Sequence, residues 1–157
     1  VKSAVGLGIL LSEGIGDTLR VSLASDPVDE VKVGYEILKS LRLRQKGVNV
    51  VACPSCGRVQ IDVDKLTLDI EKELAHIDAP ITVAVMGCEV NGPGEAREAD
   101  IGVAGGHKQA LIFMKGEKKG LIDYNQIKTN LVREVEELAA KMAASNPAKN
   151  ISGSGDV

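Results

Sequence analysis

The sequence predicts an α+β fold for most of the chain, a sheet with helices on one side, preceded by a shorter segment of different character. From residue 47 onward, runs typical of strands are interspersed with amphipathic runs typical of helices, in the order strand, strand, helix, strand, strand, hairpin, helix. A basic stretch that ends on Gly47 marks a boundary after residue 46. The 44% hydrophobic content suffices for a core, which must be aliphatic because 2% of the residues are aromatic.

The segment before the boundary, residues 1–46, is expected to be the last β/α unit of a barrel. An apolar run at 1–11 and an alternating run at 18–23 are typical of strands, and a glycine-rich turn lies between them. Asp26 is the predicted N-cap of a helix that continues to about residue 44. Many α/β folds contain such a unit, so the pattern alone is not specific. The first run begins in mid-pattern without an initiator methionine, which suggests a longer parent chain.

The remaining elements follow in order. Strands are expected at 48–52, 59–63, 81–86 and 101–104, and a hairpin at 110–122 with its turn at 116–120. Helices are expected from about Leu66 to Ile77, with Asp64 as the candidate cap, and from about Tyr124 to Ala144. Residues 47–146 thus form one predicted domain. Residues 147–157 are polar and rich in glycine and serine, and we expect a disordered tail.

All three cysteines lie at the ends of predicted strands. Cys53 and Cys56 form a C-x-x-C after the strand at 48–52, and Cys88 follows the strand at 81–86. Loops in these positions can hold soft ligands and leave one face open to a substrate. Thiolates bind zinc, copper(I) or iron-sulfur clusters, and three thiols leave a four-ligand centre one ligand short. An odd cysteine count argues against a disulfide framework and favours a reducing, cytoplasmic location.

Several kinds of cysteine site are compatible with this pattern. Cys56 and Cys88 could be small buried hydrophobes, as free cysteines often are. A zinc site usually takes four Cys or His ligands in close pairs, a spacing that His76 and His107 do not provide. A thioredoxin-like centre needs no third cysteine. An iron-sulfur cluster commonly takes a C-x-x-C, a distant cysteine and a further ligand.

Glu95 is the candidate for that further ligand. A carboxylate is harder than a thiolate and is held more weakly by iron, so a substrate can displace it. An isolated glutamate is more often a solvated loop residue. Gly92 and Gly94 favour the role of Glu95 as a ligand. Glycines let the backbone fold tightly and direct the Glu95 side chain back toward Cys88.

Three stretches resemble the 4-hydroxy-3-methylbut-2-enyl diphosphate synthases, the IspG or GcpE family. They are LSEGIGDTLRVSL at 11–23, VACPSCGR at 51–58 and MGCEVNGPGEA at 86–96. The resemblance covers nearly the whole chain apart from its last residues, and the two cysteine motifs are highly specific. It implies a TIM barrel followed by an iron-sulfur domain related to sulfite reductase modules. It also implies a [4Fe-4S] cluster whose ligands are Cys53, Cys56, Cys88 and Glu95.

The implied reaction is the reductive ring opening of 2-C-methyl-D-erythritol 2,4-cyclodiphosphate, an oxidoreductase step of the methylerythritol phosphate route to isoprenoids. The product is 4-hydroxy-3-methylbut-2-enyl diphosphate, and ferredoxin or flavodoxin supplies the two electrons. The resemblance places Glu95 and Asn91 at the reacting centre, Asn91 in contact with substrate. It implies a homodimer in which the cluster domain of one subunit caps the barrel of the other. We expect this chain alone to be inactive, because a closed barrel needs eight strands.

Arg20 and Ser22 match barrel residues that grip the diphosphate in that family. An arginine makes bidentate bonds to phosphate, and both side chains lie on one side of an alternating strand. Glu13 could line the same loop or be a solvated turn residue, and His107, beside two glycines, could reach a phosphate. We interpret the other basic residues as solvated surface: Arg58, Arg97, Lys108 and the pair at 118 and 119.

Composition excludes other classes of protein. The net charge of −3 gives no electrostatic footprint for nucleic acid. The longest apolar run is too short to span a bilayer, and nothing in the chain resembles a secretory signal. Two further functions are still open: a one-electron carrier, which should hold its cluster with four cysteines, and a zinc-bound interaction module.

Overall fold

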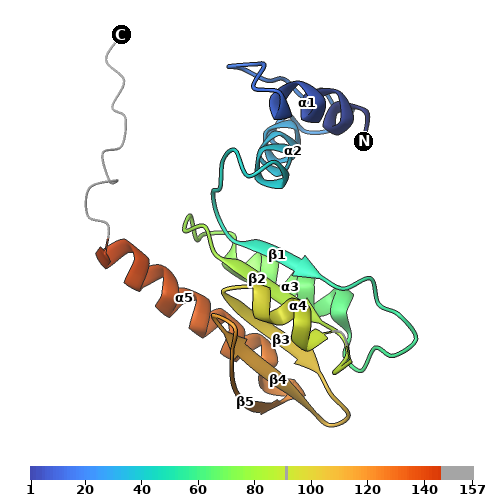
Figure 1. Cartoon of the computed structure of the whole chain (residues 1–157), viewed down its shortest axis with the longest axis vertical. Helices are drawn as coiled ribbons and strands as arrows, with labels where there is room; N and C mark the ends of the chain where they lie inside the picture. Colours follow the sequence, from blue (N-terminus) through green and yellow to red (C-terminus); the bar gives the residue numbers. More distant parts are fainter. Residues whose placement is uncertain (91, 146–157) are drawn as a thin grey trace. The chain divides into compact units, whose positions relative to one another are not determined.

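The computed structural model describes residues 1–90 and 92–145 and divides into two compact units (Figure 1). The first is Val1–Lys46, and the second begins at Gly47. Asn91 and the predicted tail at 147–157 lie outside the described residues. Each unit has its own hydrophobic core.

The first unit consists of α1 (Lys2–Ser12) and α2 (Pro27–Ser40) joined by an extended segment. The strand predicted at 1–11 is wrong, because this run is the helix α1. A continuously apolar run fits both structures, and only the contacts separate them. Leu7 and Leu11, four residues apart on one helical face, both pack into the core of the unit.

The strand predicted at 18–23 is also wrong, although its alternation is present. Leu19 and Val21 turn inward, whereas Arg20 and Ser22 are exposed. A strand is defined by hydrogen bonds to a neighbour, and the described part of this unit holds no neighbouring strand. The helix prediction for α2 is confirmed, and Asp26 caps it by accepting a 2.8 Å hydrogen bond from the Val28 N–H.

The second unit is built on a five-stranded mixed sheet in the order β1-β2-β3-β4-β5. Its strands are β1 (Asn49–Ala52), β2 (Thr82–Met86), β3 (Ile101–Gly105), β4 (Gln109–Met114) and β5 (Glu117–Asp123). The strands β1, β2 and β3 are parallel to one another, and β4 is antiparallel to both of its neighbours, β3 and β5. The predicted α+β class is therefore confirmed. The strand predicted at 59–63 is absent from the described structure, because residue 63 begins a helix.

Helices cover both faces of the sheet, which corrects the expectation of helices on one side. α3 (Val63–Leu74) and α5 (Ile127–Ser145), the latter preceded by a 3₁₀ turn at Tyr124–Gln126, pack against Val83 and Val85 of β2. α4 (Gly92–Glu98) packs against Ala84 and Met86 on the opposite face. β2 is therefore buried on both faces, as parallel strands usually are.

Local capping and turn chemistry differ slightly from the sequence prediction. Asp62, and not Asp64, caps α3, because its carboxylate accepts from the Lys65 N–H at 3.1 Å. The hairpin turn is tighter than the predicted span of 116–120. Lys115 and Gly116 form it with φ of 47° and 81°, values that two-residue hairpin turns require.

Candidate metal centre

Cys53 and Cys88 lie at the same edge of the sheet because they follow two paired parallel strands. Ala52 at the end of β1 is in register with Val85 of β2, and the Cys53 N–H donates to the Val85 carbonyl at 3.2 Å. Both cysteines thus lie at the carboxyl edge of the parallel strands, where ligands of open α/β sheets bind.

Gly87 connects the two cysteine loops through both of its backbone polar groups. Its N–H donates to the Cys53 Sγ at 3.2 Å, and its carbonyl accepts from the Gln60 N–H at 2.7 Å. The residue directly before Cys88 therefore holds the thiol of Cys53 and the chain that follows Cys56. Hydrogen bonds to sulfur are one of the means by which proteins tune iron-sulfur centres.

Only glycine fits at position 87. A Cβ there would lie 2.6 Å from the Val59 Cγ2, 2.8 Å from the Val63 Cγ2 and 3.3 Å from the Cys53 Sγ. The first two distances are shorter than real Cβ contacts allow. Sequence analysis missed Gly87. The available signal was a glycine placed between a buried strand and a cysteine.

The three cysteines are free thiols with different exposures. Cys88 is buried, Cys53 is partly buried and Cys56 is exposed. Ser55, between the first two thiols, has a φ of 48°, which is uncommon for a residue with a side chain. This conformation turns the chain sharply between Cys53 and Cys56, and such outliers are typical of ligand-holding loops.

Glu95 lies in the first turn of α4, whereas the sequence predicted it in a loop. Pro93 is tolerated in that first turn because the N–H it lacks would have no helical partner there. The expectation that tight packing requires glycine is confirmed at Gly92, where an added Cβ would lie 2.9 Å from the Met86 Cβ. It does not hold for Gly94, which has open space around it. The Glu95 side chain is exposed.

The structure brings some of the predicted ligands together and leaves others apart. Cys53 and Cys88 share the carboxyl edge of the sheet, whereas Cys56 and Glu95 project into solvent. Within the described ranges, no three His, Cys, Asp or Glu side chains are gathered closely enough to hold a metal ion. The convergence of Cys53, Cys56 and Cys88 on one centre therefore stays a prediction, as does ligation by Glu95.

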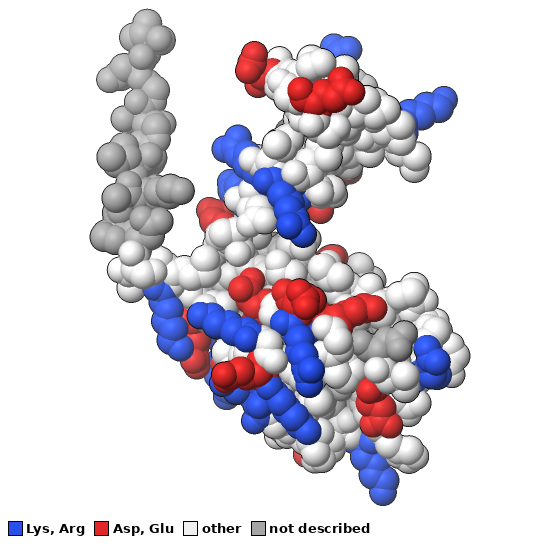
Figure 2. All heavy atoms as spheres, viewed as in Figure 1, with Lys and Arg blue, Asp and Glu red and all other residues white. Residues whose placement is uncertain are grey.

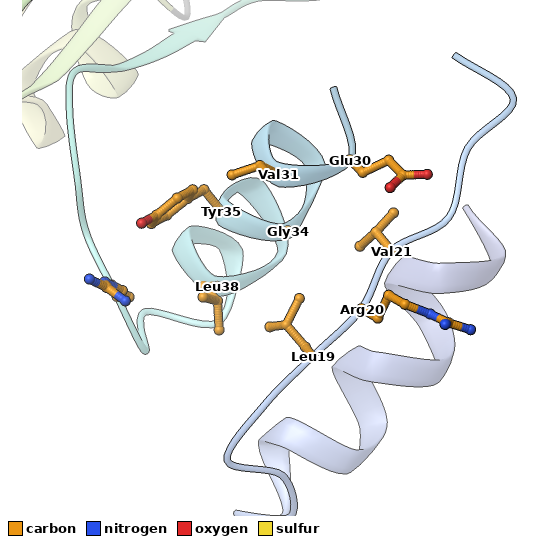
Figure 3. A pocket seen from close by; sticks show the side chains of 9 residues that line it. Leu19, Arg20, Val21, Glu30, Val31, Gly34, Tyr35 and Leu38 are labelled. Carbon is orange, nitrogen blue, oxygen red and sulfur yellow. The ribbon is translucent and has the colours of Figure 1, made fainter. Parts of the chain in front are cut away.

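Arg20 and Ser22 lie in the first unit, away from its small core. Figure 3 shows Leu19 and Val21 beside α2, whereas the Arg20 guanidinium projects away from that helix. The pocket of about 280 Å³ between this segment and α2 has a mainly aliphatic and aromatic lining. Arg20, Arg44 and Glu30 add charged groups to this lining.

The turn between β3 and β4 also reaches the carboxyl edge. A Cβ on Gly105, the last residue of β3, would lie 2.9 Å from the Gly87 carbonyl oxygen, so the chain packs directly against the cysteine loops where this turn begins. The Tyr124 hydroxyl donates to the Gly106 carbonyl. Burial, and then the nearby Glu89 carboxylate, raise the pKa of Tyr124 above its ordinary value of 10.0. No pattern in the sequence predicts this contact.

Comparison with known proteins identifies the family. A family model described as the GcpE protein C-terminal domain matches residues 49–137, more than half of the chain. The chain belongs to the GcpE family. A second model, the GcpE TIM-barrel domain, matches residues 1–35. The predicted resemblance to this family is confirmed.

Two curated relatives of this GcpE chain carry the same name. Proteins called 4-hydroxy-3-methylbut-2-en-1-yl diphosphate synthase (flavodoxin) are 60% identical to it in Geobacter sulfurreducens and 54% identical in Symbiobacterium thermophilum. The alignments cover 90% and 92% of this chain but 40% and 39% of those relatives. The GcpE chain thus spans about two fifths of the length of the proteins it matches. Among its described helices, none is long and apolar enough to cross a membrane.

Proposed function

We propose that this chain is the cluster-bearing part of an enzyme that opens the ring of 2-C-methyl-D-erythritol 2,4-cyclodiphosphate by reduction and forms 4-hydroxy-3-methylbut-2-enyl diphosphate. Two facts support the proposal: membership of the GcpE family and the printed name of the relatives. The observation that carries it is the connection of both cysteine loops through Gly87 at one edge of the sheet.

The residues present fit an iron-sulfur cluster. The donor set is three free thiols and one exposed carboxylate, and the Cys53 sulfur already accepts a backbone N–H. We assign Cys53, Cys56, Cys88 and Glu95 as the ligands of a [4Fe-4S] cluster. Such a cluster supplies single electrons and one iron with an exchangeable ligand.

Each ligand contributes differently. The paired strands β1 and β2 and the Gly87 N–H fix Cys53, and burial fixes Cys88. Cys56 and Glu95 are exposed and can move toward the other two without disturbing the core. Because Glu95 is on the short helix α4 and has a harder donor atom, it is the ligand suited to give way to a substrate oxygen.

The remaining assignments complete the proposal. Arg20 and Ser22 bind the diphosphate, and Asn91, outside the described residues, contacts substrate near the cluster. A ferredoxin or a flavodoxin donates the electrons, in keeping with the word flavodoxin in the relatives' names. The complete enzyme is a cytoplasmic homodimer in which the cluster domain, related to sulfite reductase modules, caps the partner's barrel.

Anaerobic reconstitution with iron and sulfide tests the ligand set. The unaltered chain should become brown and bind iron and sulfide in equal amounts. Cys53→Ser, Cys56→Ser and Cys88→Ser should each lose most of the iron. Glu95→Ala should bind a cluster that degrades readily to a three-iron form, visible by electron paramagnetic resonance.

The matched control is Glu98→Ala, which removes another exposed carboxylate of α4. It should leave iron content and spectra unchanged. Colourless protein that holds zinc would overturn the proposal. An unchanged cluster in Glu95→Ala would remove Glu95 from the ligand set and leave the three thiols.

A further inference from the structure

The sheet face that carries α4 is covered over only part of its width. α4 has seven residues and contacts β2, β3 and β4. Beyond it, Leu111 of β4 is half-buried, and Leu121, its partner in register on β5, is 60% exposed. The opposite face is covered by the longer helices α3 and α5. An apolar strip of sheet therefore faces solvent next to α4.

A hollow of about 500 Å³ lies on this strip and has a basic rim. Its lining includes Leu111 and Leu121, together with His107, Lys108 and Lys118. Within the described part of the chain, the side chains of Lys108 and Lys118 make neither a hydrogen bond nor an ion pair. Some other lysines are paired with acids, as Lys128 is with Glu73. Figure 2 shows basic and acidic side chains mixed over the surface in view.

The hollow adjoins the candidate metal centre. Glu89, directly after Cys88, lines it, and a Cβ on Gly106 would lie 3.3 Å from the Glu89 Oε2. The neighbouring Gly105 packs against the Gly87 carbonyl, which belongs to the connection between the cysteine loops. A molecule seated on this surface would therefore be separated from the thiols by a few residues of chain.

We propose that this surface, formed by Leu111, Leu121, His107, Lys108 and Lys118, docks an electron-carrier protein that presents acidic side chains around a reduced flavin. An apolar centre with a charged rim is the usual anatomy of a protein interface. The inference rests on the proposed function, which requires two electrons for each ring opened. In each encounter the donor's flavin is oxidised by one electron and the metal centre is reduced by one.

A protein fits this surface better than a small anion does. The Glu89 carboxylate at the inner wall repels a free phosphate, whereas the lysines on the outer rim can pair with acids on a larger partner. Leu121 gains nothing from a phosphate but would be buried under a protein. Charges on such a rim act mainly on the association rate, and salt weakens their effect.

The adjacent lysine provides a matched control. Lys119 is next to Lys118 on β5 but lines a different hollow with Glu134 and Leu138 of α5, and it pairs with Glu117 at 3.0 Å. Lys118→Glu and Lys119→Glu therefore change the net charge equally but place the new carboxylate on opposite faces of the sheet. A general charge effect would be the same for both variants, whereas a docking effect would not.

The test measures association of the reconstituted chain with a flavodoxin of acidic isoelectric point. Stopped-flow mixing at low ionic strength gives the rate of reduction, and titration with oxidised flavodoxin gives the dissociation constant. We expect Lys108→Glu and Lys118→Glu each to lower the association rate about tenfold or more, with little effect from Lys119→Glu. Added salt should slow the unaltered protein and have less effect on the two variants.

The proposal would be overturned if Lys118→Glu and Lys119→Glu had equal effects, or if the association rate with flavodoxin did not depend on salt. It would also be overturned if the Lys118→Glu variant lost self-association and kept its binding to flavodoxin. Inorganic diphosphate that blocks flavodoxin binding only when Lys108 and Lys118 are present would assign the surface to a small anion and also overturn it. The titration with oxidised flavodoxin needs no electron transfer. A chain that binds flavodoxin but no iron would contradict the proposed function alone.

Discussion

At the scale of single residues, Gly87 determines the geometry of the candidate centre more than any side chain does. Its N–H and its carbonyl are both engaged, one by the Cys53 sulfur and one by Gln60. The space that a side chain would need is filled by Val59 and Val63. Cys53 is thus positioned by backbone, which cannot rotate away as a side chain can.

Replacing Gly87 with alanine should displace both cysteine loops. Overpacking against Val59 and Val63 is expected to lower the free energy of unfolding by about 1–3 kcal/mol, measured by urea denaturation. Reconstituted Gly87→Ala should also retain less iron than the unaltered chain. Gly57→Ala is the control, because a Cβ at Gly57 meets nothing within 4 Å. Equal effects of the two substitutions would show that position 87 has no special steric role.

The sequence was sufficient to nominate the thiols but not to describe how they are held. Cys53 and Cys88 could be placed at strand ends, because apolar runs precede them. The role of Gly87 depends on side chains from residues 59 and 63 that approach only in the folded chain. Glu95 was expected in a loop because Asn-Gly-Pro-Gly is typical of turns. In the folded chain, Gly92 packs closely against Met86 and Ala104, and this segment forms the short helix α4 instead.

At the scale of elements, α4 sits unusually close to the sheet. Gly102 of β3 lies against Ala96 of α4, where an added Cβ would come within 2.5 Å of the Ala96 carbonyl oxygen. Small residues on both sides, Ala84 and Ala99 among them, complete this contact. Glu95 is the neighbour of Ala96. The distance between α4 and the sheet therefore determines how far the candidate carboxylate ligand lies from the sheet.

Gly102→Ala should therefore push α4 away from β3. Since the obstructing atom is backbone, the cost is expected to be about 2 kcal/mol or more of unfolding free energy. Gly94→Ala on α4 itself meets no atoms and should stabilise the protein by about 0.5–1 kcal/mol, the usual gain of alanine over glycine within a helix. Thermal denaturation of both variants checks the opposite signs, and a stable Gly102→Ala protein would contradict the close packing.

The ion pair between Lys128 of α5 and Glu73 of α3 should make stability depend on alkaline pH. The hydrogen bond to Glu73, reinforced by its charge, raises the pKa of Lys128 above its ordinary value of 10.5. The folded state thus holds this proton more tightly. The stabilisation is fully present below pH 10.5 and is lost as the pH rises through the raised pKa.

Glu73→Gln should consequently be less stable than the unaltered protein at neutral pH, and the difference should shrink as the pH rises above 10.5. The effect is small because both side chains are partly exposed. Urea titrations at several pH values measure it. Glu71→Gln, an exposed acid on the same helix, is the control and should show no such convergence. A difference that persisted at high pH would mean that Glu73 acts through packing.

The elements that sequence analysis found and missed differ in their physical basis. α2, α3 and α5 have amphipathic periods and β2 is a long buried run, so local pattern alone predicted them. α1 is apolar from Ala4 to Leu11, and its helical state depends on which side chains reach the core. The segment 18–23 alternates as a strand does but lacks a partner in the described part of its unit.

At the scale of the whole molecule, the two units are connected through an exposed basic segment. Arg44 and Lys46 lie 5.5 Å and 5.9 Å from the ring centre of Tyr35 on α2, so cation–π contacts hold this segment against the first unit. The cores on either side have no shared residues. The second unit contains most of the buried side chains and should fold without the first.

Limited digestion with trypsin should cut first after Arg42, Arg44 or Lys46. The product that begins near Gly47 is expected to keep its far-ultraviolet circular dichroism and a cooperative unfolding transition. Tyr35→Ala should speed this cleavage, because the segment then loses its contact with α2. Mass spectrometry of early time points identifies the first cut. A first cut inside the strands of the second unit would contradict its independence.

The order of the strands has a consequence for how the protein behaves in concentrated solution. β1 and β5 end the sheet, and the open backbone of such edges can pair with another chain. β1 is only four residues long, which leaves little to pair with. β5 carries Glu117, Lys118 and Lys119, and its register shifts opposite Ile112 and Phe113. Charge and irregularity at one edge and shortness at the other thus protect an aliphatic, valine-rich sheet from growing into fibrils.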